Sequence, residues 1–289
     1  MSYDVYSGML KMMDNFEKPL TYSANFTYEH GHPKLIELCD TYSIKQIAGN
    51  NGELSQAINL LNWLSDNTFH ISNYAGDVRL NSLGLLKYSY KQGIERGLNC
   101  QCLATILTEC CLSIGLKART LYIMPFSPYD EDNHVVTMVF ITHLDKWIML
   151  DPSYNAYLID ENGKILSPWE ARQLLSGQEK IKPCETYNYN GDYTGEISGE
   201  PPQYYIEYMA KDLFWFFCAE KNTFNSAGLD FNQMLFLTPS GFDAKKFQIA
   251  NIEYRIRKYG KKEILTNWLA KVKQDEPVYI SFNEFWAKP

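Results

Sequence analysis

Three residues of this chain, Cys100, His134 and Asp151, have the types and the order of a nucleophilic relay. Cys100 follows a turn-forming Gly-Leu-Asn run and opens an apolar pattern of helical spacing that closes at Gly115. At a helix start, the unpaired backbone N–H groups and the positive end of the helix dipole favour a thiolate over a thiol. We therefore expect Cys100 to be a nucleophile at the N-terminus of a buried helix.

A predicted hairpin brings the other two residues together. An apolar run, VVTMVFIT, follows His134, and a second run, WIMLDPSY, contains Asp151. If the connection between the runs is even in length, His134 pairs with Ser153, and Asp151 lies on the same face one diagonal step away. Pro152 keeps Asp151 extended and ends the strand. The imidazole can then take the thiol proton while the carboxylate orients the ring.

When the thiolate adds to a carbonyl carbon, the carbonyl oxygen becomes an oxyanion, which hydrogen-bond donors must stabilise. The backbone N–H of Cys100 is one such donor. Gln92, Tyr88 and Tyr90 are the candidates for a second donor, and the sequence does not choose between them. The relay requires no cofactor. A metal site is not expected, because Cys100 and Cys102 have no second ligand pair near them.

The composition limits the partners and the compartment. A formal net charge of -7 and a pI near 5.3 argue against a nucleic-acid binder. No apolar stretch is long enough for a membrane span, and the N-terminus lacks the apolar region of a signal peptide. The cysteines number 7, which is odd, and lack a secretory context, so we expect a reduced, cytoplasmic protein. The 21 tyrosines and 15 phenylalanines are consistent with a groove for peptides or sugars.

The remaining elements suggest a division of the chain. We expect an N-terminal extension over 1–45, a catalytic core over 46–184, a linker or long loop over 185–203, and a C-terminal helical layer over 204–289. The predicted elements are helices from Glu53, over 81–91, from Cys100, from Pro168, over 204–219 with its FWFF run, around 243–258 and over 260–274, and strands over 119–124, 234–239 and 277–282.

The combined spacing resembles the core motif of the transglutaminase-like superfamily of papain-like cysteine enzymes, in a bacterial-type member. In that family the cysteine opens a helix that ends in a Gly-x-x-x-Arg step, the histidine begins the next-but-one strand, and the aspartate ends the strand after it. Cys100, Gly115 to Arg119, His134 and Asp151 occupy the matching positions, over roughly residues 50–175.

The resemblance implies an α+β fold in which an antiparallel sheet packs on the nucleophile helix, with helical N- and C-terminal additions. It also implies acyl transfer from amides of peptides or proteins through a cysteine thioester, to water or to an amine. Calcium dependence is not expected, because Asp130, Glu131 and Asp132 are consecutive and lack the alternation of a calcium loop.

Two other functions fit the same residues. Arylamine N-acetyltransferases use the same Cys, His, Asp order with acetyl-CoA, but their cysteine lies in an Arg-Gly-Gly-x-Cys context from which Arg96-Gly97-Leu98-Asn99-Cys100 departs. A non-catalytic binding domain could retain the three residues by descent. The substrate, the acyl acceptor and the oligomeric state stay open at this point.

Overall fold

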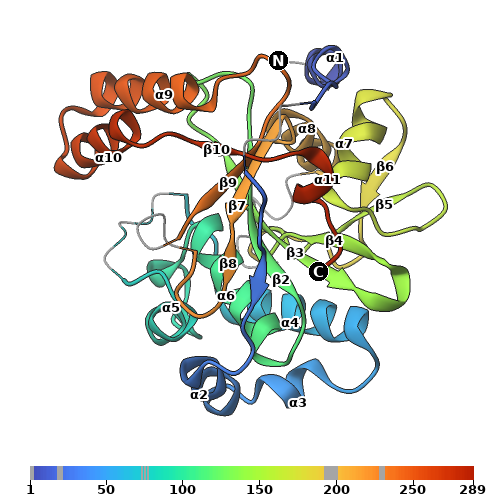
Figure 1. Cartoon of the computed structure of the whole chain (residues 1–289). Helices are drawn as coiled ribbons and strands as arrows, with labels where there is room; N and C mark the ends of the chain where they lie inside the picture. The colour runs from blue at the N-terminus through green and yellow to red at the C-terminus, as the bar shows by residue number, and fades with distance from the viewer. Residues whose placement is uncertain are drawn as a thin grey trace.

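A six-stranded sheet forms the centre of the computed structural model, which describes residues 3–17, 22–72, 74, 76, 78–191, 201–227 and 232–289. Its strands follow the order β10-β9-β7-β2-β3-β4 (Figure 1). All neighbours are antiparallel except β9 and β10, which are parallel. The fold is therefore α+β as expected, but the sheet is mixed at one edge rather than wholly antiparallel. The strands are β2 (Ala118–Met124), β3 (His134–Ile141), β4 (Lys146–Leu150), β7 (Trp215–Ala219), β9 (Met234–Leu237) and β10 (Val278–Tyr279).

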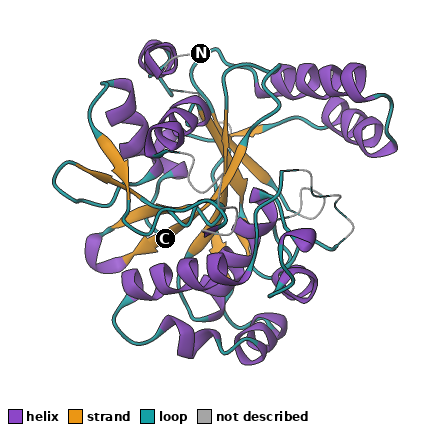
Figure 2. Cartoon of the chain, turned by 180° about the vertical axis from the view of Figure 1, so that it is seen from behind, coloured by secondary structure: helices purple, strands orange, loops and turns teal. Residues whose placement is uncertain are grey.

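Helices cover both faces of this sheet (Figures 1 and 2). One face packs on α2 (Pro33–Thr41), α3 (Ile44–Ala48), α4 (Glu53–Asn67), α5 (Ser82–Ser89) and α6 (Cys100–Ser113). The other face packs on α1 (Tyr3–Met12), α7 (Pro168–Ser176), α8 (Pro202–Asp212), α9 (Ala244–Tyr259) and α11 (Phe282–Phe285), while α10 (Glu263–Gln274) packs on α9. Each face has its own hydrophobic core. In β3, Val139 belongs to the core on the α6 side and Met138 to the core on the α8 side, because successive side chains of a strand point to opposite faces.

The smaller elements are β1 (Thr27–Tyr28) with β8 (Lys221–Asn222), β5 (Leu158–Asp160) with β6 (Ile181–Pro183), and the 3-10 turns at Ile94–Arg96 and Thr142–Leu144. No helix in the described part of the chain is both long enough and apolar enough to cross a membrane.

The central helix of the first face is α6, and it begins at Cys100 as predicted. The side chain of Asn99 caps it by accepting a hydrogen bond from Cys102 N–H at 3.0 Å. Every residue from Cys102 to Leu112 is buried, and Gly115 takes the positive φ of +92° that ends the helix. Within α6, partial exposure is therefore confined to the two ends, with Cys100 and Gln101 at the start and Ser113 at the last position.

The β3–β4 hairpin has the predicted pairing. Thr137 pairs with Leu150 and Met138 with Met149, which is the register that places His134 opposite Ser153. The connection between the strands contains the 3-10 turn Thr142–Leu144. The predicted geometric relation between the two ends of the hairpin is confirmed.

The FWFF run at 214–217 corrects a prediction. The helix expected over 204–219 ends at Asp212, and Trp215–Ala219 forms β7, a wholly buried strand between β2 and β9. A strand that is buried on both faces is apolar throughout, so its periodicity does not distinguish it from a buried helix.

The C-terminal part of the chain is therefore not the helical layer that was expected over 204–289. It contributes β7, β9 and β10, which continue the same sheet as β2, β3 and β4. Residues 192–200, which are nearly half of the linker expected at 185–203, lie outside the described residues. The N-terminal segment also packs on the main body, since Arg119 is buried and donates to Tyr28 Oη at 2.6 Å.

Candidate active site

His134 and Asp151 form a buried hydrogen-bonded pair. His134 is the first residue of β3 and Asp151 directly follows β4, and His134 Nε2 lies 2.7 Å from Asp151 Oδ2. Their side chains are 2% and 1% exposed, so water does not screen the interaction. Burial alone lowers the pKa of His134, but the Asp151 carboxylate outweighs it and, with Cys100, raises the pKa well above its ordinary value. The imidazole can therefore hold a proton in this buried place.

The turn after β4 fixes the Asp151 carboxylate. The Ser153 N–H donates to Asp151 Oδ1 at 3.0 Å. The backbone N–H of Asp151 donates to Ala156 O at 2.7 Å, and the N–H of Ala156 donates back to Asp151 O at 3.0 Å. One oxygen of the carboxylate thus points to the turn and the other to His134.

Cys100 lies beside His134. It contributes a side-chain hydrogen bond and a charge effect that raise the pKa of the imidazole. Because His134 Nε2 faces Asp151, Nδ1 is the ring nitrogen left for the sulfur. Cys100 is partly exposed, whereas the other six cysteines are buried. The structure therefore brings all three predicted residues into one chain of contacts, with the partly exposed Cys100 at one end.

Helix α8 adds tyrosines that sequence reasoning missed. The Tyr205 hydroxyl is fully buried and donates to Asp151 Oδ2 at 3.1 Å. The ring centroid of Tyr208 lies 5.1 Å from that of His134, and its hydroxyl donates to Asp132 Oδ1 at 3.1 Å. Their three-residue spacing marks one face of a helix. Nothing in that spacing indicates that the face meets Asp151.

A buried acid, Asp212, ends α8 near His134. Lys211 Nζ lies 3.5 Å from Asp212 Oδ2, but it also donates to the backbone carbonyl of Asp132 at 2.7 Å and approaches the carboxylate of Asp130. One ammonium thus faces several carboxyl groups. Burial raises the pKa of Asp212 well above its usual range, Lys211 opposes this only in part, and Asp132 reinforces it. Asp212 therefore holds its proton more strongly than an ordinary aspartate does.

The three candidates for a second oxyanion donor, Gln92, Tyr88 and Tyr90, contact residues other than Cys100 and His134. Gln92 is exposed and its Nε2 lies 3.4 Å from Tyr90 O. The Tyr90 ring packs against Tyr42 and Trp63, and the Tyr88 ring packs against Tyr74 and Arg96, the latter in cation–π geometry. These contacts do not join Gln92, Tyr88 or Tyr90 to Cys100 or His134. Of the four donors considered, the backbone N–H of Cys100 is the one that belongs to the cysteine itself.

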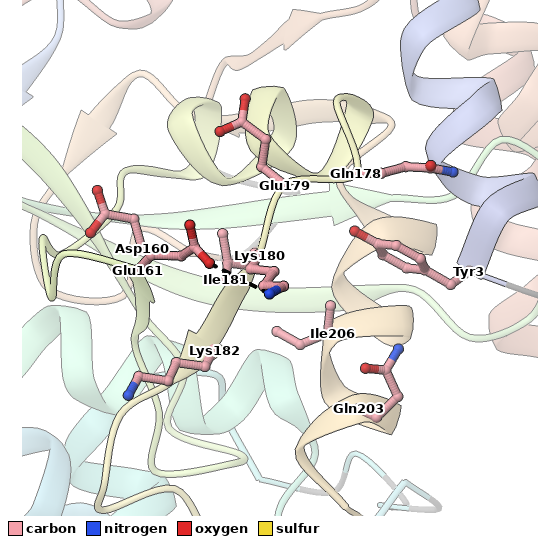
Figure 3. Close-up of a pocket in the computed structure, with 10 residues that line it drawn as sticks. All are labelled: Tyr3, Asp160, Glu161, Gln178, Glu179, Lys180, Ile181, Lys182, Gln203 and Ile206. Carbon is pink, nitrogen blue, oxygen red and sulfur yellow. Dashed lines mark ion pairs between the residues drawn. The ribbon is translucent and has the colours of Figure 1, made fainter.

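The surface hollow in Figure 3 lies outside this site. It has a volume of about 490 Å³ and is lined by charged residues of the β5–β6 region, with Tyr3 of α1 and Ile206 of α8. Figure 3 also shows the ion pair between Lys180 and Glu161 on its wall. Ile206 faces the hollow, while its neighbour Tyr205 reaches Asp151, so α8 stands between the two places. Within the described residues, no three His, Cys, Asp or Glu side chains are grouped to hold a metal ion.

Comparisons with known proteins add little to the geometry. No protein-family model matches the sequence, and no curated protein matches it. Among solved structures, the chain is similar to one described as "a Putative Cysteine Protease from Cytophaga hutchinsonii", with a TM-score of 0.32 and 15% sequence identity. That match covers 52% of this chain and 49% of the other.

Proposed function

We propose that this protein is a cysteine enzyme of the transglutaminase-like type, which cleaves or transfers at amide bonds of peptides or proteins through a thioester on Cys100. The observation that carries the proposal is the buried His134–Asp151 pair, 2.7 Å apart, placed beside the partly exposed thiol of Cys100 at the start of α6. A nucleophile, a base within reach and a group that orients the base are the parts that acyl transfer needs.

The reaction begins with proton transfer from the Cys100 thiol to His134 Nδ1. The thiolate forms a bond to the amide carbonyl carbon, and the backbone N–H of Cys100 stabilises the oxyanion. The tetrahedral adduct expels the amine, which takes the proton from His134, and leaves a thioester on the sulfur. Water or an amine then attacks the thioester, His134 takes the proton of the attacking group, and that proton returns to the departing sulfur.

The site favours this chemistry over a purely structural role for the three residues. The Asp151 carboxylate raises the pKa of His134 despite the burial of the ring, so the imidazolium is stabilised next to the sulfur. A buried histidine that served packing alone would gain nothing from a charged partner, and burial would keep it neutral.

The test is to trap the thioester. The full chain is incubated with a peptide library, quenched in acid, and analysed by mass spectrometry for acyl groups on Cys100. We expect peptide acyl groups on Cys100, and none when His134 is replaced by Ala. An acetyl group that appears only with acetyl-CoA would instead indicate the acetyltransferase function. A Cys100 that stays unmodified in every mixture would contradict an enzyme and leave a binding domain.

Selective alkylation of Cys100 is not sufficient by itself. The other six cysteines are buried, so exposure alone predicts that Cys100 reacts first. The informative comparison is between the wild-type chain and the His134→Ala variant at the same cysteine, because exposure is then matched and only the base differs.

A further inference from the structure

Two donors meet on one oxygen of Asp151. His134 Nε2 lies 2.7 Å from Oδ2, and the Tyr205 hydroxyl donates to the same Oδ2 at 3.1 Å. The other oxygen, Oδ1, accepts from Ser153 N–H at 3.0 Å. Asp151 and Tyr205 are fully buried, so no water competes for these positions. A buried carboxylate needs such donors to stay charged.

Tyr205 is held in place by its own surroundings. Its ring lies 4.8 Å from that of Tyr154 and 5.3 Å from that of Tyr187, measured between centroids. Burial raises the pKa of the Tyr205 phenol well above its usual value, and the Asp151 charge raises it further. The phenol therefore stays protonated and acts only as a donor.

We propose that Tyr205 is a positioning residue, which holds Asp151 Oδ2 toward His134 and moderates how strongly the carboxylate binds the proton of the imidazole. The phenol donates most strongly when the imidazole is neutral and Asp151 has no other charged donor. It thus stabilises the neutral-imidazole state more than the imidazolium state. The inference rests on the proposed function in that His134 must release its proton to a leaving amine, which a too strongly held imidazolium would do slowly.

Several other groups face His134 and must stay constant in any test. They are Cys100 on α6, Tyr154 after β4, and Tyr208 and Asp212 on α8. Of these, only Cys100 exchanges a proton with His134 in the proposed reaction. A background in which Cys100 is replaced by Ala therefore isolates the His134–Asp151 pair.

The experiment is an NMR titration of His134 in the full chain carrying Cys100→Ala, with and without Tyr205→Phe. We expect Tyr205→Phe to move the His134 midpoint upward by about half a pH unit. This is a fraction of the full strength of a hydrogen bond to a charge, because the bond is lost from both protonation states and only the difference shifts the midpoint. A 3,5-difluorotyrosine at position 205, which donates more strongly, should move the midpoint downward. A role in packing alone predicts no shift from the fluorinated residue, and that result would overturn the proposal.

Tyr28→Phe is the matched control. Its hydroxyl also contacts a charged group, Arg119 Nε at 2.6 Å, but it lies away from His134. It should leave the titration of His134 unchanged. If Tyr205→Phe does not fold, the fluorinated residue alone decides the matter. The titration requires no turnover, so its result is independent of the thioester experiment. It can support the role of Tyr205 when no thioester forms, and it can contradict that role when a thioester does form.

Discussion

The hydroxyl of Thr137 donates to the backbone carbonyl of Ala104 at 3.0 Å, and this bond joins the first turns of α6 to the start of β3. Ala104 lies one helical turn after Cys100, and Thr137 lies three residues after His134. The bond is buried, so water does not replace it. This hydrogen bond therefore connects α6, which carries the Cys100 thiol, directly to β3, which carries the His134 imidazole.

We predict that Thr137→Val weakens the coupling between Cys100 and His134. Valine matches the shape of threonine but loses the hydroxyl, so the expected loss in free energy of unfolding is about 1 kcal/mol. The rate of Cys100 alkylation near neutral pH should fall several-fold. Thr105→Val is the control, because its hydroxyl donates to Gln101 O at 2.8 Å within the same helix. Equal effects of the two substitutions on alkylation would contradict a specific role for the Thr137–Ala104 bond.

Asp151→Asn should make the reactivity of Cys100 more dependent on pH. The amide keeps the size of the carboxylate but removes the charge that raises the pKa of His134. Burial then dominates and lowers the pKa of the imidazole, so the imidazolium is lost as the pH rises through a lower value than before.

The measurement is the rate of Cys100 alkylation between pH 5 and pH 9. We expect the variant to react at least about tenfold more slowly than the wild type near pH 6, and to approach it near pH 9, where free thiols ionise without help. Parallel profiles for the two proteins would show that the Asp151 charge does not act on the sulfur.

A fragment restricted to residues 46–184 should not fold cooperatively. Without β7, the β2 residues Leu121 to Met124 lose their antiparallel partners, and a long apolar edge is exposed. The fragment also lacks Tyr205 and its bond to Asp151. We expect no sharp thermal transition by circular dichroism for the fragment and a single one for the full chain. A sharp transition in the fragment would instead support the division into core and C-terminal layer that the sequence suggested.

The parts of the fold that depend on local sequence are predictable. The helix starts at Glu53 and Pro168 follow from apolar spacing and from a Ser167 capping box, and the register of the β3–β4 hairpin follows from its short connection. The placing of Cys100, His134 and Asp151 rests on these local features. For that reason their proximity can be expected from sequence.

The parts that depend on distant segments are not predictable in this way. Tyr205 is 54 residues from Asp151 along the chain, and only the packing of α8 on the sheet brings them together. The run from Trp215 to Ala219 has no alternation to identify it as a strand, because both of its faces are buried. Neither the Tyr205–Asp151 hydrogen bond nor the strand from Trp215 to Ala219 can therefore be predicted from composition and spacing.

Glu109 provides a prediction about stability rather than activity. It is fully buried in α6, where its carboxylate accepts from Ser82 N–H at 2.8 Å, from Ser82 Oγ at 2.5 Å, and from Asn225 N–H at 2.8 Å. Burial raises the pKa of Glu109 to about 7, although these hydrogen bonds oppose the rise. In the unfolded chain a glutamate has its ordinary pKa, near about 4.3.

Between these two values the folded protein binds more protons at Glu109 than the unfolded chain does. The free energy of unfolding should therefore decrease as the pH rises from about 4.3 toward 7, and become level above it, with a total change of at most roughly 4 kcal/mol from this group. Glu109→Gln has no proton to lose, so urea denaturation of this variant should lack that part of the pH dependence. Exposed Glu37 on α2, replaced by Gln, is the control and should leave the wild-type profile unchanged. If Glu109→Gln retained the full wild-type slope between pH 5 and pH 7, Glu109 would have to be ionised in the folded protein throughout that range, and the donors Ser82 and Asn225 would outweigh its burial.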